Sequence, residues 1–100
     1  MQKIHKDKAD ILQVIREKQP ELTSRFTVRH IGVFGSFARD SASAESDVDI
    51  LVELAEPTFD HYMDLKFYLE EVLKRSVDLV MAETVKPRLR PIISKEVVYA

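Results

Sequence analysis

The sequence predicts an α/β (α+β) protein, in which helices flank a small mixed β-sheet of three to four strands. Two observations predict this fold class. Three short apolar runs rich in β-branched residues have the length of strands, and segments with helical spacing of apolar residues separate them. Strands that alternate with helices are typical of a sheet covered by helices. A chain of 100 residues has the size of one domain, residues 1–100, with one modest core.

The composition is that of an ordinary globular protein, with 45% apolar and 32% charged residues. The net charge of -2 is not that of a protein that coats nucleic acid, so we expect no strong nucleic-acid binding. The chain has no cysteine, which excludes disulfides and thiolate metal sites. No apolar stretch has membrane-spanning length, and the charged N-terminus does not resemble a signal peptide. We therefore expect a cytoplasmic protein that does not bind membranes.

The first half of the chain predicts one helix and two strands. Apolar residues recur at helical spacing over about residues 5–18, and Pro20 ends this pattern. The β-branched and aromatic run from Val28 to Phe34 predicts the first strand. Residues 36–46 are rich in Ser and Ala and predict a short helical turn followed by a loop. The run from Val48 to Leu54 predicts the second strand.

The longest predicted helix opens at Pro57, with Thr58 as its N-cap. Its apolar residues form one stripe along the helix, made of Phe59, Tyr62, Leu65, Leu69, Val72 and Leu73. Three aromatic residues of this segment, Phe59, Phe67 and Tyr68, are candidates for either core packing or a surface that faces a partner.

The last quarter of the chain predicts a third strand and a short helix. Residues 76–81 are apolar with one aspartate inside, as in the second strand. Residues 86–95 predict a helix that starts at Pro87 or Pro91, because proline is tolerated in a first helical turn. The segment 97–99 predicts either an edge strand or a tail.

Two aspartates, Asp47 and Asp49, stand at the head of the second predicted strand. Side chains alternate in a strand, so both lie on one face, about 6.6 Å apart at roughly 3.3 Å per residue. Asp78 has a similar place in the third strand and joins them if the two strands are neighbours. Clustered carboxylates repel, and a hard divalent cation such as Mg²⁺ or Mn²⁺ relieves this repulsion. The alternative is that these acids mark strand ends that face water.

Gly35-Ser36 follows the first predicted strand and precedes the helical turn. Glycine has no β-carbon, so it permits a tight turn and the close approach of an anion. The Ser36 hydroxyl and the backbone amides at the start of the turn are donors for phosphate. Arg39 lies about one turn further along, within reach of a triphosphate tail. Taken alone, Gly-Ser is an ordinary turn and Arg39 a surface residue; the prediction depends on their combination with the acids.

These motifs resemble the polymerase-beta-like nucleotidyltransferase superfamily: Gly35-Ser36, ten intervening residues, Asp47-x-Asp49, and a later acid in a strand. The segments GSFAR, SDVDILVE and VDLV, in so short a chain, are similar to its minimal members, the MNT-type antitoxins. The resemblance extends from about Val28 to Val80, and the tail KPRLRPIISKEVVYA is similar to the end of such domains. The chain departs from the family at Asp40, where glycine usually follows the arginine, and this negative charge lies near the expected phosphate path.

The resemblance implies a nucleotidyltransferase fold and a role for each matching residue. Gly35 and Ser36 would hold the nucleotide phosphates, Asp47 and Asp49 would bind two Mg²⁺ ions, and Asp78 would bind the catalytic metal and help activate the attacking hydroxyl. Proteins of this type are paired with a HEPN-family RNase toxin, and some transfer AMP to a tyrosine of that toxin. The resemblance thus implies an antitoxin that transfers AMP from ATP to a tyrosine hydroxyl of its toxin by two-metal catalysis.

The residues leave three other functions open. The same fold could neutralise a toxin by binding alone. It could also transfer a nucleotide to a small molecule or an RNA end, although relatives of that kind usually carry an extra domain. An acyl-phosphate phosphatase also has an Asp-x-Asp motif after a strand, but it gives Gly35-Ser36 no role and normally has a longer chain.

Overall fold

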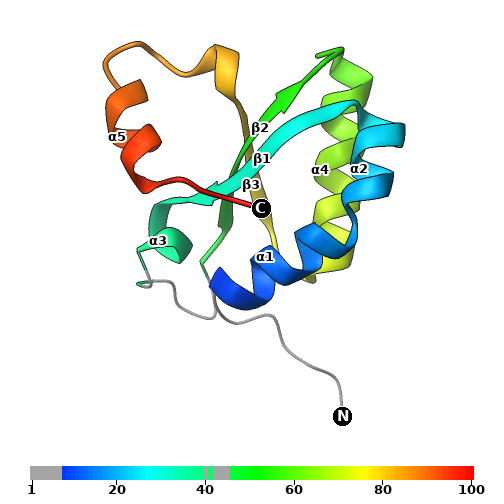
Figure 1. Cartoon of the computed structure of the whole chain (residues 1–100), viewed down its shortest axis with the longest axis horizontal. Helices are drawn as coiled ribbons and strands as arrows, with labels where there is room; N and C mark the ends of the chain where they lie inside the picture. The colour runs from blue at the N-terminus through cyan, green and yellow to red at the C-terminus, as the bar shows by residue number, and fades with distance from the viewer. Residues whose placement is uncertain (1–7, 40, 42–45) are drawn as a thin grey trace.

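A four-stranded mixed sheet with helices on both sides makes up the fold (Figure 1). The computed structural model describes residues 8–39, 41 and 46–100. In chain order the elements are α1 (Lys8–Glu17), α2 (Gln19–Phe26), β1 (Val28–Phe34), α3 (Gly35–Ala38), β2 (Val48–Leu54), α4 (Phe59–Leu73), β3 (Val77–Met81), the 3₁₀ helix η1 (Ala82–Thr84), α5 (Arg90–Glu96) and β4 (Val98–Tyr99). The predicted fold class, a small mixed sheet flanked by helices, is confirmed.

The strands lie in the order β3-β2-β1-β4. β1 pairs with β2 and with β4 in antiparallel fashion, whereas β2 and β3 are parallel. In this register Asp49 is opposite Phe34 on one side and Asp78 on the other. The strand neighbours that the acid cluster requires are therefore present.

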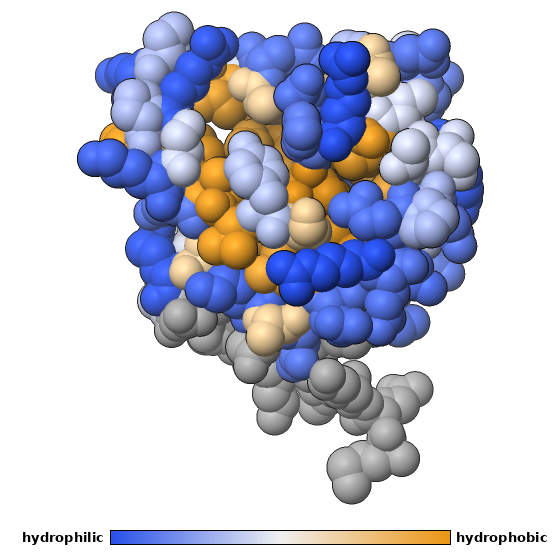
Figure 2. Space-filling model, in the orientation of Figure 1, coloured by the Kyte–Doolittle hydropathy of each residue, from blue (hydrophilic) through white to orange (hydrophobic). Residues whose placement is uncertain are grey.

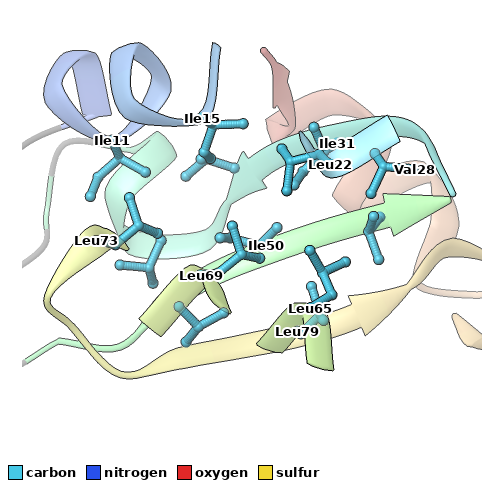
Figure 3. Packing of buried hydrophobic residues seen from close by; sticks show 14 of the residues in the cluster. Ile11, Ile15, Leu22, Val28, Ile31, Ile50, Leu65, Leu69, Leu73 and Leu79 are labelled. Atoms are coloured by element: carbon cyan, nitrogen blue, oxygen red, sulfur yellow. The ribbon is translucent and has the colours of Figure 1, made fainter. Parts of the chain in front are cut away.

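The core lies on one face of the sheet, beneath α1, α2 and α4 (Figure 3). Side chains from these helices pack on strand residues such as Ile31, Ile50 and Leu79, and Ile50 is fully buried. Because side chains alternate along β2, Asp49 and Leu51 project from the opposite face. Figure 1 shows α5 on that second side of the sheet. The fold thus places the main core on one face of the sheet and the Asp49 carboxylate on the other.

The N-terminal region differs from the prediction because Pro20 does not simply end a helix. α1 ends at Glu17, and a second helix, α2, follows at once with Pro20 in its first turn, where the missing amide is not needed. Leu22 and Phe26, four residues apart, are buried against the core. Their spacing was the available sign of this second helix.

Most other elements are confirmed within a residue or two. The hydroxyl oxygen of Thr58 accepts a hydrogen bond of 3.1 Å from the His61 amide, as expected for an N-cap. α5 begins next to Pro91, and residues 98–99 form an edge strand on β1. The placement of Phe59 in the apolar stripe was wrong, because its side chain is 75% exposed. None of the helices in the described part of the chain is long and apolar enough to cross a membrane.

Candidate functional site

Asp49 and Asp78 are brought together by the parallel pairing of β2 and β3, in which they are directly opposite each other. Burial raises the pKa of the Asp49 carboxyl above its ordinary value, and the charge of Asp78 and a hydrogen bond with it raise it further. The charge of Asp47 acts in the same direction, while that of Arg39 lowers the pKa. Asp49 is thus half-buried among negative charges, which a cation would neutralise.

Asp47 lies just before β2 and is exposed. The chain on either side of it is held in place: Arg75 donates a 2.8 Å hydrogen bond to the Ser46 carbonyl, and the Val48 amide donates to the Ser76 carbonyl at 2.9 Å. Among residues 8–39, 41 and 46–100, no group of three or more His, Asp or Glu side chains is arranged to hold a metal ion. The three-carboxylate metal site therefore stays a prediction.

Gly35 lies directly beside Asp49. Its φ is +70°, a conformation that favours glycine, and a β-carbon at this position would lie 2.9 Å from the Asp49 Cγ and closer still to its carboxylate oxygen. The turn and the carboxylate therefore need glycine at this position. Ser36 follows in the first turn of α3 and is half-buried, and its carbonyl accepts a hydrogen bond of 2.9 Å from the Ser41 amide.

Arg39, at the end of α3, donates a hydrogen bond from Nη1 to Oε1 of Glu96 on α5. The Arg39 side chain is 56% exposed and that of Glu96 is 24% exposed, so the glutamate is the more buried partner. The position of Arg39 near Asp49 agrees with a role at a phosphate tail. Glu96 was not among the predicted site residues. Asp40, the departure from the family pattern, lies outside the described residues.

The donor set fits a hard divalent cation. All candidate ligands are carboxylate oxygens, which suit Mg²⁺ or Mn²⁺ better than softer metals. The paired acids repel each other, and Gly35 leaves room for the Asp49 carboxylate. Asp49 and Asp78 are opposite each other on the paired strands, and the charge of Asp47 acts on the Asp49 carboxyl. The acid pair and the glycine-serine turn are thus next to each other at one end of β1, β2 and β3.

Comparison with known proteins shows extensive similarity. The family model described as "Nucleotidyltransferase domain" matches residues 8–100. Protein adenylyltransferase MntA of Thermococcus cleftensis is 43% identical over 91 residues, which are 90% of this chain and 92% of that protein. A solved structure proposed to be a minimal nucleotidyltransferase is 36% identical, with a TM-score of 0.78 over 94% of this chain and 96% of the other.

A more distant solved structure has the same fold. It is a complex of a tri-AMPylated HEPN toxin from Shewanella oneidensis with an MNT antitoxin. Its matching chain is 22% identical, with a TM-score of 0.57 over 92% of this chain and 66% of the other. At this identity the likeness concerns the fold alone.

Proposed function

Because the chain belongs to the nucleotidyltransferase domain family, we propose that it transfers AMP from ATP to a hydroxyl group of a partner protein. The observation that carries this proposal is the pairing of Asp49 with Asp78 beside Gly35 on one face of the sheet. A relative named as a protein adenylyltransferase, 43% identical over nearly the whole chain, supports a protein as the acceptor.

Each predicted site residue has a place in this reaction. Gly35 and Ser36 bind the triphosphate, and Arg39 adds positive charge near its tail. Asp47, Asp49 and Asp78 would hold two Mg²⁺ ions, or Mn²⁺ in their place. When bound, the ions would supply charge neutralisation and would lower the pKa of the acceptor hydroxyl. Positioning and electrostatic stabilisation account for most of the acceleration in phosphoryl-type transfers.

We propose a HEPN-family RNase toxin as the partner and a tyrosine of that toxin as the acceptor. The chain would then be an antitoxin that modifies and silences its toxin in the cytoplasm. The fold shared with the antitoxin of the Shewanella oneidensis complex is compatible with this pairing.

The test is incubation of the chain and its partner toxin with α-labelled ATP and Mg²⁺. We expect the label to appear on the toxin and to disappear with Asp47→Asn or Asp49→Asn. Asp64→Asn is the matched control, because Asp64 is an exposed carboxylate on α4, away from the site. The proposal fails if the toxin is not labelled, or if Asp49→Asn labels as well as the wild type.

A second candidate function is neutralisation by binding alone. It is favoured by one observation, that no three-carboxylate metal group is formed within the described residues. In that case the toxin would stay inhibited with Asp47→Asn and Asp49→Asn, and no label would be transferred. Toxin activity, measured in the same reactions, therefore separates the two functions.

A further inference from the structure

A cavity of about 640 Å³ opens on the same face of the sheet as Asp49. Leu51 and Glu53 line it, and alternation along β2 places them on the Asp49 face, roughly 6.6 and 13 Å further along the strand. Asp49 itself is not among the lining residues. The volume lies within the range of about 300–1,000 Å³ that is usual for small-molecule sites. The cavity is thus separate from the acid pair, and its nearest lining residue on β2 is Leu51, two residues beyond Asp49.

The walls of this cavity come from segments far apart in the sequence. β2 forms one wall, the segment from Ala82 to Val85 and helix α5 form others, and Tyr99 of β4 lies at its margin. Apolar side chains such as Leu51, Val85 and Ile93 are combined with a few polar ones. Figure 2 shows apolar residues in the middle of this view of the molecule, with hydrophilic residues around them. This mixture suits a flat apolar ligand with polar edges.

The order of the strands indicates which part of the reactants can reach the cavity. The Gly35 turn ends β1, Asp49 lies on β2 and Asp78 on β3, so these three positions cross the sheet in a line. In an in-line displacement the leaving pyrophosphate and the attacking hydroxyl are on opposite sides of the α-phosphate. With the phosphate tail at Gly35, the hydroxyl arrives from the Asp78 side. The nucleoside must then extend away from the line that joins Gly35, Asp49 and Asp78. The cavity lies further along β2, in a direction that crosses this line.

We propose that this cavity binds the nucleoside part of the nucleotide substrate; the inference rests on the proposed function. Tyr99 has an exposed fraction of 53% and presents a ring on which a base can stack. Glu53 and Ser94 supply oxygen atoms for hydrogen bonds with the base or the ribose. Arg29 lies 3.7 Å from Glu53 and holds that carboxylate at the wall. The nucleotide therefore lies along one face of the sheet, with its tail at Gly35 and its nucleoside in the cavity beside α5.

The test compares the binding of ATP with that of inorganic tripolyphosphate, which has the tail and no nucleoside, both with Mg²⁺. Ser94→Trp places a large side chain in the cavity, and Ile92→Trp is the matched control, because Ile92 is exposed on the same helix and does not line the cavity. We expect Ser94→Trp to weaken ATP binding by about five- to a hundredfold, the range for loss of one base stack. Tripolyphosphate binding should not change, and Tyr99→Ala should show the same selective loss.

Other results would overturn the inference. ATP binding that is unchanged in both Ser94→Trp and Tyr99→Ala would show that the nucleoside lies elsewhere. Equal weakening of ATP and tripolyphosphate would show damage to the tail site and no nucleoside contact. Unchanged ATP binding together with lost transfer to the partner would assign the cavity to the acceptor. These results differ from those expected if the proposed function itself is wrong, because the wild-type chain would then bind neither ATP nor tripolyphosphate.

Discussion

The carboxylate of Asp49 occupies the space beside Gly35 that the β-carbon of any other residue would need. A β-carbon on Gly35 would lie 2.9 Å from the Asp49 Cγ, and the φ of +70° is strained for residues other than glycine. The glycine of the turn and the acid of the neighbouring strand are therefore one structural unit. A phosphate-binding turn and a metal-binding carboxylate next to each other are what the proposed reaction requires.

Gly35→Ala should disrupt this unit. The strained φ alone costs about 1–3 kcal/mol of stability, and the collision displaces the Asp49 carboxylate. A displacement of about 1 Å at reacting groups can lower the rate roughly a hundredfold. We expect AMP transfer to fall by about this factor, together with a lower unfolding temperature. Rates of label transfer and thermal unfolding curves measure the two effects.

Two further variants separate the effects of backbone strain, of contact with Asp49 and of lower stability on the transfer rate. Gly35→Asn tolerates the positive φ better but still carries a β-carbon, so its transfer rate should remain low. Thr58→Ala removes the N-cap of α4 at a cost of about 1 kcal/mol and should leave the rate unchanged. If Gly35→Asn restored normal transfer, strain and not the contact with Asp49 would explain the loss.

Ionised Asp49 should destabilise the metal-free protein. Its pKa is raised, chiefly by burial and then by Asp78, so the folded state binds this proton more tightly than the unfolded chain does. The protonated Asp49 carboxyl therefore stabilises the fold. This contribution is complete below the pKa of the unfolded chain, about 3.9, and is lost as the pH rises through the pKa of the folded state. Asp49→Asn should therefore raise the unfolding temperature at pH 7 in EDTA, and this gain should shrink towards pH 4.

The unfolding temperatures of the wild type and Asp49→Asn also test whether Mg²⁺ binds at Asp49. Mg²⁺ should raise the unfolding temperature of the wild type, because a ligand that binds only the folded state stabilises it. It should have little effect on Asp49→Asn, which lacks the charge. An Asp49→Asn protein less stable than the wild type at both pH values would contradict the conclusion that the ionised Asp49 carboxylate destabilises the metal-free fold.

Local patterns predicted the fold and the family, while the roles of the site residues stay a prediction. Alternation placed Asp47 and Asp49 on one face, and the Gly35-Ser36 spacing indicated the family that the comparisons confirm. Whether Asp78 would meet them depended on which strands are neighbours, which no local pattern states. The parallel β2-β3 pairing decides that point.

Most features that the sequence did not predict depend on contacts between segments far apart in the chain. Glu96 lies 57 residues from Arg39 in the sequence, so their pairing could not be read from spacing. The cavity has the same origin, because its walls come from β1, β2, η1, α5 and β4. Pro20 was misread for a local reason: the same residue ends one helix and starts another. Phe59 fits the helical period but lies beyond the edge of the sheet-facing stripe, and it is exposed.

Glu96 should act on nucleotide binding through Arg39. Its carboxylate accepts a hydrogen bond from Arg39 and limits the freedom of that side chain. Immobilising a long side chain on binding costs about 0.5–1.5 kcal/mol, so Glu96→Ala should raise the KM for ATP roughly two- to tenfold, with a smaller change in kcat. Glu96→Gln keeps the acceptor oxygen and should stay near the wild type.

A double-mutant cycle with Arg39→Ala checks this route. If Glu96 acts by positioning Arg39, Glu96→Ala should have no additional effect in the Arg39→Ala background. The same increase in KM in both backgrounds would mean that Glu96 acts on the site by another path. A decrease in KM would mean that Glu96 competes with the phosphates for Arg39.

Arg75 should position Asp47 from outside the site. It donates a 2.8 Å hydrogen bond to the carbonyl of Ser46, the residue before Asp47, and its guanidinium lies 4.9 Å from the centroid of the Phe37 ring. Arg75→Ala removes both contacts, so we expect a loss of about 1–3 kcal/mol in stability and at least a tenfold fall in AMP transfer. Arg75→Lys keeps the charge but not the planar geometry, and it should recover little of the transfer rate.

Arg25 provides the control for this prediction, because it has similar contacts far from the site. Its guanidinium lies 4.9 Å from the centroid of the Phe26 ring and pairs with Glu21 at 3.4 Å. Arg25→Ala should lower the unfolding temperature and leave the transfer rate unchanged, since α2 lies on the core side of the sheet. If Arg25→Ala and Arg75→Ala lost transfer in proportion to their loss of stability, Arg75 would be only a structural residue. A loss of transfer confined to Arg75→Ala, at a temperature where both variants are folded, identifies the link from Arg75 through Ser46 to Asp47.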